Sequence, residues 1–231
     1  MTQIYAHRGA SKIFPENSLE AFEHAETLGS GWIELDVWLS KDGILTVHHD
    51  QKLETGEIIT ESDYSGFPEN VPTLQDVLNS TKEIGINVEV KTQDNYALDS
   101  QTRRLIDELS QLLQSEGRSR DFLVSSFNSK CLSYFRDVSP ATPVGILIWE
   151  LREDWDLLLT EVINSDFQAI HPANSLVTRN LIAACKQKEI DINVWTVNDE
   201  DRMEELIDFG VDGIITDVPD VALGVVAGRD G

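Results

Sequence analysis

The chain has 231 residues and a formal net charge of −23, because 41 acidic side chains outnumber 18 basic ones. This charge disfavours nucleic acid and anionic membrane surfaces as partners, but a pocket holding a cation and basic side chains could still bind a small anion. No segment approaches the ~20 apolar residues that a membrane span needs, so we expect no stable membrane insertion.

The cysteines and the N-terminus bear on location. Cys131 and Cys185 lack a metal-type spacing and form no disulfide framework. The first expected strand begins shortly after Met1, which leaves no room for a signal peptide. We therefore expect a reducing, cytoplasmic setting.

The first expected strand, at 3–6, leads into the tripeptide His-Arg-Gly at 7–9. A helix is expected at 19–28, where apolar residues recur at helical spacing. Asn17 or Ser18 is a suitable N-cap for it.

The second strand, at 32–39, alternates between two faces. One face is aliphatic and should pack against a helix layer. The other carries Glu34 and Asp36, which are costly inside an apolar strand unless a positive group lies between them. The alternative is an edge strand whose acids face water.

A turn at Asp42-Gly43 and a returning strand at 44–47 then bring His48 and His49 towards these acids. The alternation places the two histidines on opposite sides. Residues 51–71 are polar and rich in turn residues, so we expect an insertion there and no helix.

Strand and helix patterns alternate through the rest of the chain. Further strands are expected at 87–91, 122–127, 144–149, 169–171, 192–197 and 213–216. Further helices are expected at 74–78, 99–116, 128–137, 155–163, 181–188, 203–209 and 221–226. This pattern predicts an α/β fold, a (β/α)8 TIM barrel, formed by a single domain over 1–231 with a short insertion at about 51–71.

In such a barrel, functional groups lie where the strands end. The first strands deliver His7, Arg8, Glu34, Asp36, His49, Glu89 and Lys91 to that end. Three carboxylates suit a hard cation such as magnesium or calcium better than zinc. Two histidines offer acid/base chemistry, and an arginine and a lysine offer phosphate recognition. Together these groups indicate metal-assisted cleavage of a phosphoester.

Short motifs in a fixed order carry a family resemblance. They are HRG at 7–9, PENS at 15–18, ELD at 34–36, KDG at 41–43, HD at 49–50, PTLQDVL at 72–78, EVK at 89–91, WTVN at 195–198 and GVDGIITDVPD at 210–220. The chain thereby resembles the glycerophosphodiester phosphodiesterases over nearly its whole length.

The resemblance implies metal-dependent hydrolysis of small-molecule glycerophosphodiesters to sn-glycerol 3-phosphate and an alcohol. It implies one divalent cation, magnesium or calcium. The residues implied are Glu34, Asp36 and Glu89 as metal ligands, His7 and His49 as the acid/base pair, and Arg8 and Lys91 for the phosphate. Which histidine is the acid stays open, as does the nucleophile, either water or the glycerol 2-hydroxyl.

The same match selects His49 for catalysis and leaves His48 to packing. Trp195 either belongs to the core or forms an aromatic wall for the glycerol moiety. Asp217 ends the last strand and is expected to cap the final turn. Glu16 and Asn17 are expected to brace the first loop by orienting Arg8.

Two alternative functions remain. One is phospholipase D-like hydrolysis of lysophospholipids, which the lack of an apolar surface anchor disfavours. The other is a non-catalytic barrel that binds polyol phosphates. Such a barrel would be expected to lack one of the site histidines or acids, and none is missing from this sequence. The insertion is shorter than is usual in the family, and it reads LETG at 53–56 where the family tends to carry Arg-Thr after the leucine. The alcohol that is recognised and the oligomeric state therefore stay open.

Overall fold

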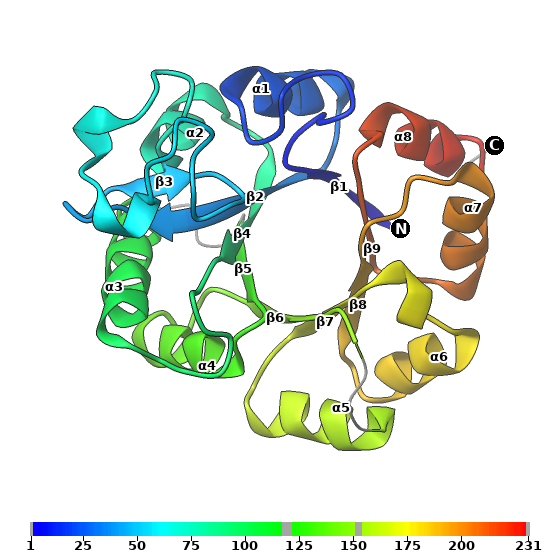
Figure 1. The fold of residues 1–231 in the computed structure, drawn as a ribbon. Helices are drawn as coiled ribbons and strands as arrows, with labels where there is room; N and C mark the ends of the chain where they lie inside the picture. The colour runs from blue at the N-terminus through cyan, green and yellow to red at the C-terminus, as the bar shows by residue number, and fades with distance from the viewer. Residues whose placement is uncertain (1, 117–121, 151–153, 230–231) are drawn as a thin grey trace.

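The computed structural model describes residues 2–116, 122–150 and 154–229. Within these residues, eight parallel strands form a closed barrel that helices surround (Figure 1). The barrel strands are β1 (Gln3–His7), β2 (Trp32–Leu39), β4 (Gly85–Val90), β5 (Phe122–Ser126), β6 (Val144–Ile148), β7 (Ala169–Pro172), β8 (Asp191–Val194) and β9 (Gly213–Thr216). β1 pairs in parallel with both β2 and β9, so the first and last strands close the barrel. The predicted (β/α)8 fold is confirmed.

The α-helices form the outer layer of the barrel (Figure 1). They are α1 (Leu19–Leu28), α2 (Leu74–Ser80), α3 (Ser100–Ser115), α4 (Ser129–Val138), α5 (Trp155–Asn164), α6 (Arg179–Gln187), α7 (Glu200–Phe209) and α8 (Pro219–Ala227). Ser18 is the N-cap of α1, because its hydroxyl accepts a hydrogen bond from the backbone N–H of Ala21. Among the described residues, no helix is both long and apolar enough to cross a membrane.

The short strand β3 (Leu45–Val47) lies outside the barrel and pairs antiparallel with β2, as the turn pattern predicts. The insertion at 51–71, which the structure describes in full, contains two single-turn 3-10 helices, η1 (Ile59–Glu61) and η2 (Tyr64–Gly66), and no α-helix. Another 3-10 turn, η4 (Asn174–Leu176), follows β7. Leu53, Ile59 and Val71 of the insertion pack with Trp38 of β2 and form a small second core.

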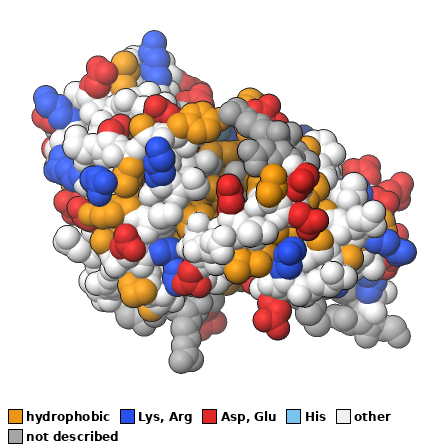
Figure 2. Space-filling model, turned by 90° about the horizontal axis from the view of Figure 1, so that it is seen from below, with side chains coloured by type: hydrophobic (Ala, Val, Ile, Leu, Met, Phe, Trp, Pro, Cys, Tyr) orange, Lys and Arg blue, Asp and Glu red, His pale blue; other side chains and the backbone are white. Residues whose placement is uncertain are grey.

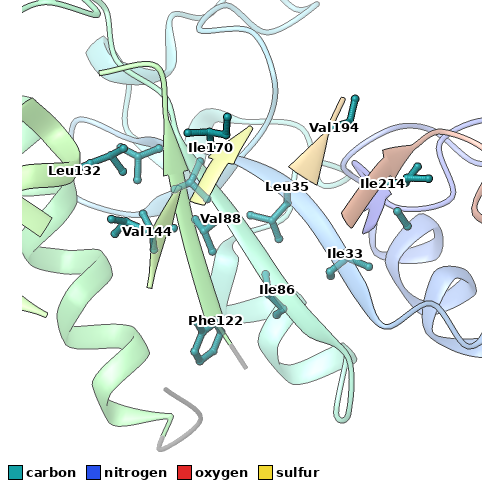
Figure 3. Close-up of a cluster of buried hydrophobic side chains, with 14 of the residues drawn as sticks. Ile33, Leu35, Ile86, Val88, Phe122, Leu132, Val144, Ile170, Val194 and Ile214 are labelled. Carbon is teal, nitrogen blue, oxygen red and sulfur yellow. The ribbon is translucent and has the colours of Figure 1, made fainter. Parts of the chain in front are cut away.

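The main core lies between the outer face of the barrel and the helices. Figure 3 shows the aliphatic side chains of neighbouring strands, among them Leu35 and Val88, gathered there. Leu35 is fully buried, so the aliphatic face of β2 packs against helices as predicted. β8 ends at Val194, earlier than the predicted 197, and Val197 packs into this core.

A groove of about 480 Å³, lined by apolar and polar side chains, lies between α4 and α5. Ile146, Leu158 and Phe127 are among the residues that line it. Figure 2 shows hydrophobic side chains gathered near the middle of one face of the molecule, with acidic and basic side chains scattered around them.

Candidate active site

A cavity of about 190 Å³ opens at the carboxyl ends of the barrel strands. Alternation along each strand directs every second side chain into the barrel, which is why residues from β1, β2 and β4 meet there. The cavity is lined by His7, Arg8, Glu34, His49, Asn87, Glu89, Lys91, Ser125, Phe127, Leu147, Trp195 and Ile215. Seven of the eight predicted site residues are in this lining, and the eighth, Asp36, contacts two of them.

Glu34, Asp36 and Glu89 form a compact acidic cluster. Each offers a carboxylate oxygen, and these oxygens lie within 4.8 Å of one another. Glu34 and Asp36 share the inner face of β2, and Glu89 lies beside Asp36 in the register of β4. All three residues are buried, and Glu89, the most exposed of them, is 9% exposed. Three buried carboxylates repel one another, so the cluster requires positive charge.

Two basic side chains supply part of that charge. Lys91 Nζ lies 2.9 Å from Glu89 Oε1 and 3.2 Å from Asp36 Oδ1. Arg8 Nε lies 3.3 Å from Asp36 Oδ2, and its Nη1 donates to both carboxylate oxygens of Glu16 at 3.0 Å. The expectation that Glu16 orients Arg8 is therefore confirmed, and Asp36 is ion-paired with both basic side chains.

The first loop also holds the acids directly. The backbone N–H of Arg8 donates to Glu34 Oε2 at 3.0 Å. Asn17 Nδ2 donates to Asp36 Oδ2 at 2.8 Å, so Asn17 serves the cluster while Ser18 caps α1. Both Arg8 and Asn17 adopt a left-handed backbone, with φ of 56° and 57°. The sequence pattern does not reveal that Asn17 lies beside Asp36.

The pKa values show that the basic groups do not offset the acids completely. Burial, together with the charges of Asp36 and Glu89, raises the pKa of Glu34 to about 8. Burial and the Asp36 charge raise the pKa of Glu89 as well. Burial alone would raise the pKa of Asp36, but Lys91 and Arg8 hold it below its usual value. An all-oxygen donor set with this surplus of negative charge fits a hard divalent cation.

His7 and His49 face the cavity from different elements. His7 Nδ1 donates to Asp217 Oδ1 at 2.6 Å, and its Nε2 lies 3.9 Å from Glu34 Oε2. Burial would lower the pKa of His7, but the bond to Asp217 and the Glu34 charge raise it above its usual value. The pKa of His49 is lowered, first by burial and then by the Lys91 charge. His49 Nδ1 lies 2.7 Å from Asp50 Oδ1.

The prediction that Asp217 caps the final turn is wrong. Its carboxylate accepts hydrogen bonds from His7, Ser11 and Asn198, and Val218 precedes α8 without a side-chain cap. Closure of the barrel between β1 and β9 brings Asp217 to His7, a contact that strand patterns cannot reveal. The side chains of Asn87 and Ser125 were also missed, although each continues the inward alternation of its strand.

One side of the cavity is apolar. Trp195 and Phe127 meet edge to face with ring centroids 5.7 Å apart, and Leu147 and Ile215 complete this side. Trp195 Nε1 donates to the carbonyl of His171 at 2.6 Å, which fixes the indole. His48 is not among the lining residues, and its Nδ1 lies 2.7 Å from the carbonyl of Asp50.

Comparison with known families accounts for this constellation. Residues 7–57 and 53–221 match the model of the Glycerophosphoryl diester phosphodiesterase family. The chain belongs to this family. It is 32% identical to the glycerophosphodiester phosphodiesterase of Caldanaerobacter subterraneus subsp. tengcongensis, over 97% of this chain and 98% of that protein.

Solved structures agree with the fold. A glycerophosphodiester phosphodiesterase from Parabacteroides distasonis is 27% identical, with a TM-score of 0.87 over 100% of this chain and 98% of that one. The Oleispira antarctica phosphodiesterase in complex with the product sn-glycerol-3-phosphate is 23% identical, with a TM-score of 0.88 over 98% of this chain and 97% of that one. This last likeness supports the barrel fold alone.

Proposed function

We propose that this chain hydrolyses glycerophosphodiesters to sn-glycerol 3-phosphate and an alcohol, with the help of one divalent cation. Family membership and the 32% identity to a full-length glycerophosphodiester phosphodiesterase support the reaction. The observation that carries the proposal is the single cavity in which three buried carboxylates meet two histidines and two basic side chains.

Glu34, Asp36 and Glu89 would hold the cation, which we take to be magnesium or calcium because all three donors are carboxylate oxygens. When bound, a divalent cation neutralises phosphate oxygens and stabilises the charge that develops in the transition state. The pKa of Glu34, raised first by burial and then by the charges of Asp36 and Glu89, supports this assignment, because a bound cation would stabilise the ionised carboxylate.

Arg8 and Lys91 would bind the phosphate. Both line the cavity, and each already contacts the acidic cluster, so they lie at the border between the acids and the open space. An arginine matches two oxygens of a phosphate at once, whereas a lysine acts as a point charge. Trp195 would form the wall against which the carbon chain of the glycerol packs.

His7 and His49 would carry the protons. One removes the proton from the attacking hydroxyl or water, and the other donates a proton to the oxygen of the leaving alcohol. Asp217 and Asp50 hold Nδ1 of the two rings, which leaves Nε2 of each ring for this exchange. The cation-binding carboxylates are thus flanked by two oriented imidazoles.

The test is release of glycerol 3-phosphate from glycerophosphocholine, glycerophosphoethanolamine and glycerophosphoglycerol by the purified chain. The proposal expects glycerol 3-phosphate and the free alcohol in equal amounts. Release of phosphocholine in place of choline would show cleavage of the other ester bond and would overturn it. No hydrolysis of any member of the series, with magnesium or calcium present, would favour the non-catalytic polyol-phosphate barrel.

One observation favours lysophospholipids as a second substrate class. The groove between α4 and α5, whose lining is apolar in part, shares Phe127 and Leu147 with the acid-lined cavity, so an acyl chain could extend from one into the other. Ile146→Glu, which places a charge in the groove and outside the cavity, should then reduce hydrolysis of lysophosphatidylcholine but not of glycerophosphocholine. Equal activity of the variant on both would remove this candidate.

A further inference from the structure

Two neutral polar side chains in the cavity have no function in the mechanism above. Asn87 is 1% exposed and Ser125 is fully buried, and both line the cavity. Among the described residues, three atoms lack a hydrogen-bond partner here: the amide oxygen and nitrogen of Asn87 and the hydroxyl of Ser125. A buried polar atom without a partner is costly, so such atoms indicate a group that binds there.

The two side chains lie next to the acids. Asn87 is beside Glu34 in the register of β2 and β4, and Ser125 is beside Glu89 in the register of β4 and β5. They therefore form a polar patch on the inner wall, adjacent to the expected position of the phosphate and cation. Phe127, Leu147, Trp195 and Ile215 line the cavity as its apolar part.

The hydrogen-bonding character of this patch selects among ligand groups. The Asn87 amide oxygen needs a donor, its nitrogen needs an acceptor, and the Ser125 hydroxyl can serve as either. An ionised phosphate oxygen only accepts, so it would leave the amide oxygen without a partner. An alcohol hydroxyl both donates and accepts, and it brings no charge into a buried site.

We propose that Asn87 and Ser125 bind the free hydroxyls of the glycerol moiety and thereby make the cavity specific for a small polyol phosphate. This inference rests on the proposed function and adds the element that distinguishes glycerol from other alcohols. The cavity of about 190 Å³ is several times the ~30 Å³ of one water molecule and suits a three-carbon polyol whose carbon chain packs on the apolar side. The alcohol that leaves would then lie towards the mouth.

The test compares two ligands that share phosphate and carbon chain. sn-Glycerol 3-phosphate and n-propyl phosphate differ only in the two hydroxyls, and their affinities can be measured by calorimetry with magnesium present. The wild type should prefer glycerol 3-phosphate. Asn87→Leu keeps the branched shape and the number of heavy atoms of the side chain and removes both polar atoms. It should weaken the binding of glycerol 3-phosphate by roughly 5- to 100-fold and leave the binding of n-propyl phosphate unchanged.

Ser125→Ala is the second variant, because it removes one oxygen that has no protein partner and should fold normally. It should also weaken the binding of glycerol 3-phosphate and leave the binding of n-propyl phosphate unchanged. Ser126→Ala is the matched control: its hydroxyl donates to the carbonyl of Val90 at 2.8 Å and is not part of the cavity lining. It should leave the ratio of the two affinities unchanged.

Three results would overturn the inference. An unchanged ratio in both variants would mean that the patch holds only water. If Asn87→Leu bound both ligands more weakly by the same factor and also bound magnesium more weakly, Asn87 would support the cation. A wild type without preference for glycerol 3-phosphate would remove the polyol subsite. If the wild type nevertheless releases glycerol 3-phosphate from glycerophosphocholine, the proposed function stands and only the subsite fails.

Discussion

The imidazole of His7 is held by Asp217, a residue 210 positions away, with 2.6 Å between His7 Nδ1 and Asp217 Oδ1. His7 ends the first strand of the barrel, and Asp217 directly follows the last. The hydrogen bond thus spans the seam at which β1 and β9 close the barrel. It fixes the ring orientation and favours the protonated form of His7, because the carboxylate stabilises the imidazolium.

Asp217→Asn should lower the pKa of His7. The bond to Asp217 raises this pKa, so removal of the negative charge makes the imidazolium less stable and the proton is lost at lower pH. In a plot of kcat/KM against pH, the limb that reports the titration of His7 should move to lower pH by roughly one unit or more. Asp220→Asn, at an exposed position in the first turn of α8, is the control and should leave the profile unchanged. An unshifted limb in Asp217→Asn would mean that Asp217 has a structural role only.

His49→Ala should reduce turnover by ~10²–10⁴, the usual loss when a general acid or base is removed. His48→Ala, one residue away and outside the cavity lining, is the matched control and should have little effect. Turnover of both variants on glycerophosphocholine at saturating substrate checks this. The reverse pattern would show that His48 supplies the imidazole.

The sequence predicts most of the fold and of the charged site because both follow from alternation. The two-residue period of strands places Glu34 with Asp36 and Glu89 with the lysine two positions later, and the rhythm of strands and helices predicts the barrel. The prediction that residues 1–231 form one domain stays a prediction.

Contacts made by loops and by barrel closure do not follow from a local pattern. Asn17, which has a left-handed backbone conformation in the first loop, donates to Asp36, and Asp217 meets His7 at the closed seam. Asn87 was missed for another reason. A neutral amide in a strand resembles an ordinary buried polar residue until its lack of partners is seen in three dimensions.

The stability of the cation-free protein should fall as pH rises from about 4.5 to about 8. The pKa of Glu34 is raised from 4.5 to about 8, so the folded state retains a proton that the unfolded state has already lost. A cation binds the ionised carboxylates, so magnesium or calcium should raise Tm more at pH 8 than at pH 5. Thermal unfolding at both pH values, with and without the cation, measures this. A cation effect that is equal at both pH values would contradict it.

Glu89→Gln tests the same cluster by substitution. The variant should fold and should lose most of the cation-induced rise in Tm, because an amide is a weaker ligand for a hard cation than a carboxylate. Glu23→Gln, at an exposed position of α1, is the control and should retain the full rise. Cation binding by Glu89→Gln with wild-type affinity would exclude Glu89 as a ligand.

Arg8→Lys should be strongly impaired although it keeps the charge. Arg8 contacts Asp36 through Nε and Glu16 through Nη1, and a lysine cannot make both contacts and still present a fork to a phosphate. Turnover and KM on glycerophosphocholine measure the loss, with Arg104→Lys on the exposed surface of α3 as control. Near-normal kinetics would assign Arg8 to the loop scaffold and leave the phosphate to Lys91.

Hydrolysis should depend on a cation held by the acidic cluster. The most direct measurement is the rate of glycerol 3-phosphate release from glycerophosphocholine by chelator-treated protein, followed during titration with magnesium and, separately, with calcium. We expect no release in excess chelator and recovery of the rate with at least one of the two cations, saturating at one ion per chain. Full release of glycerol 3-phosphate in excess chelator would contradict it.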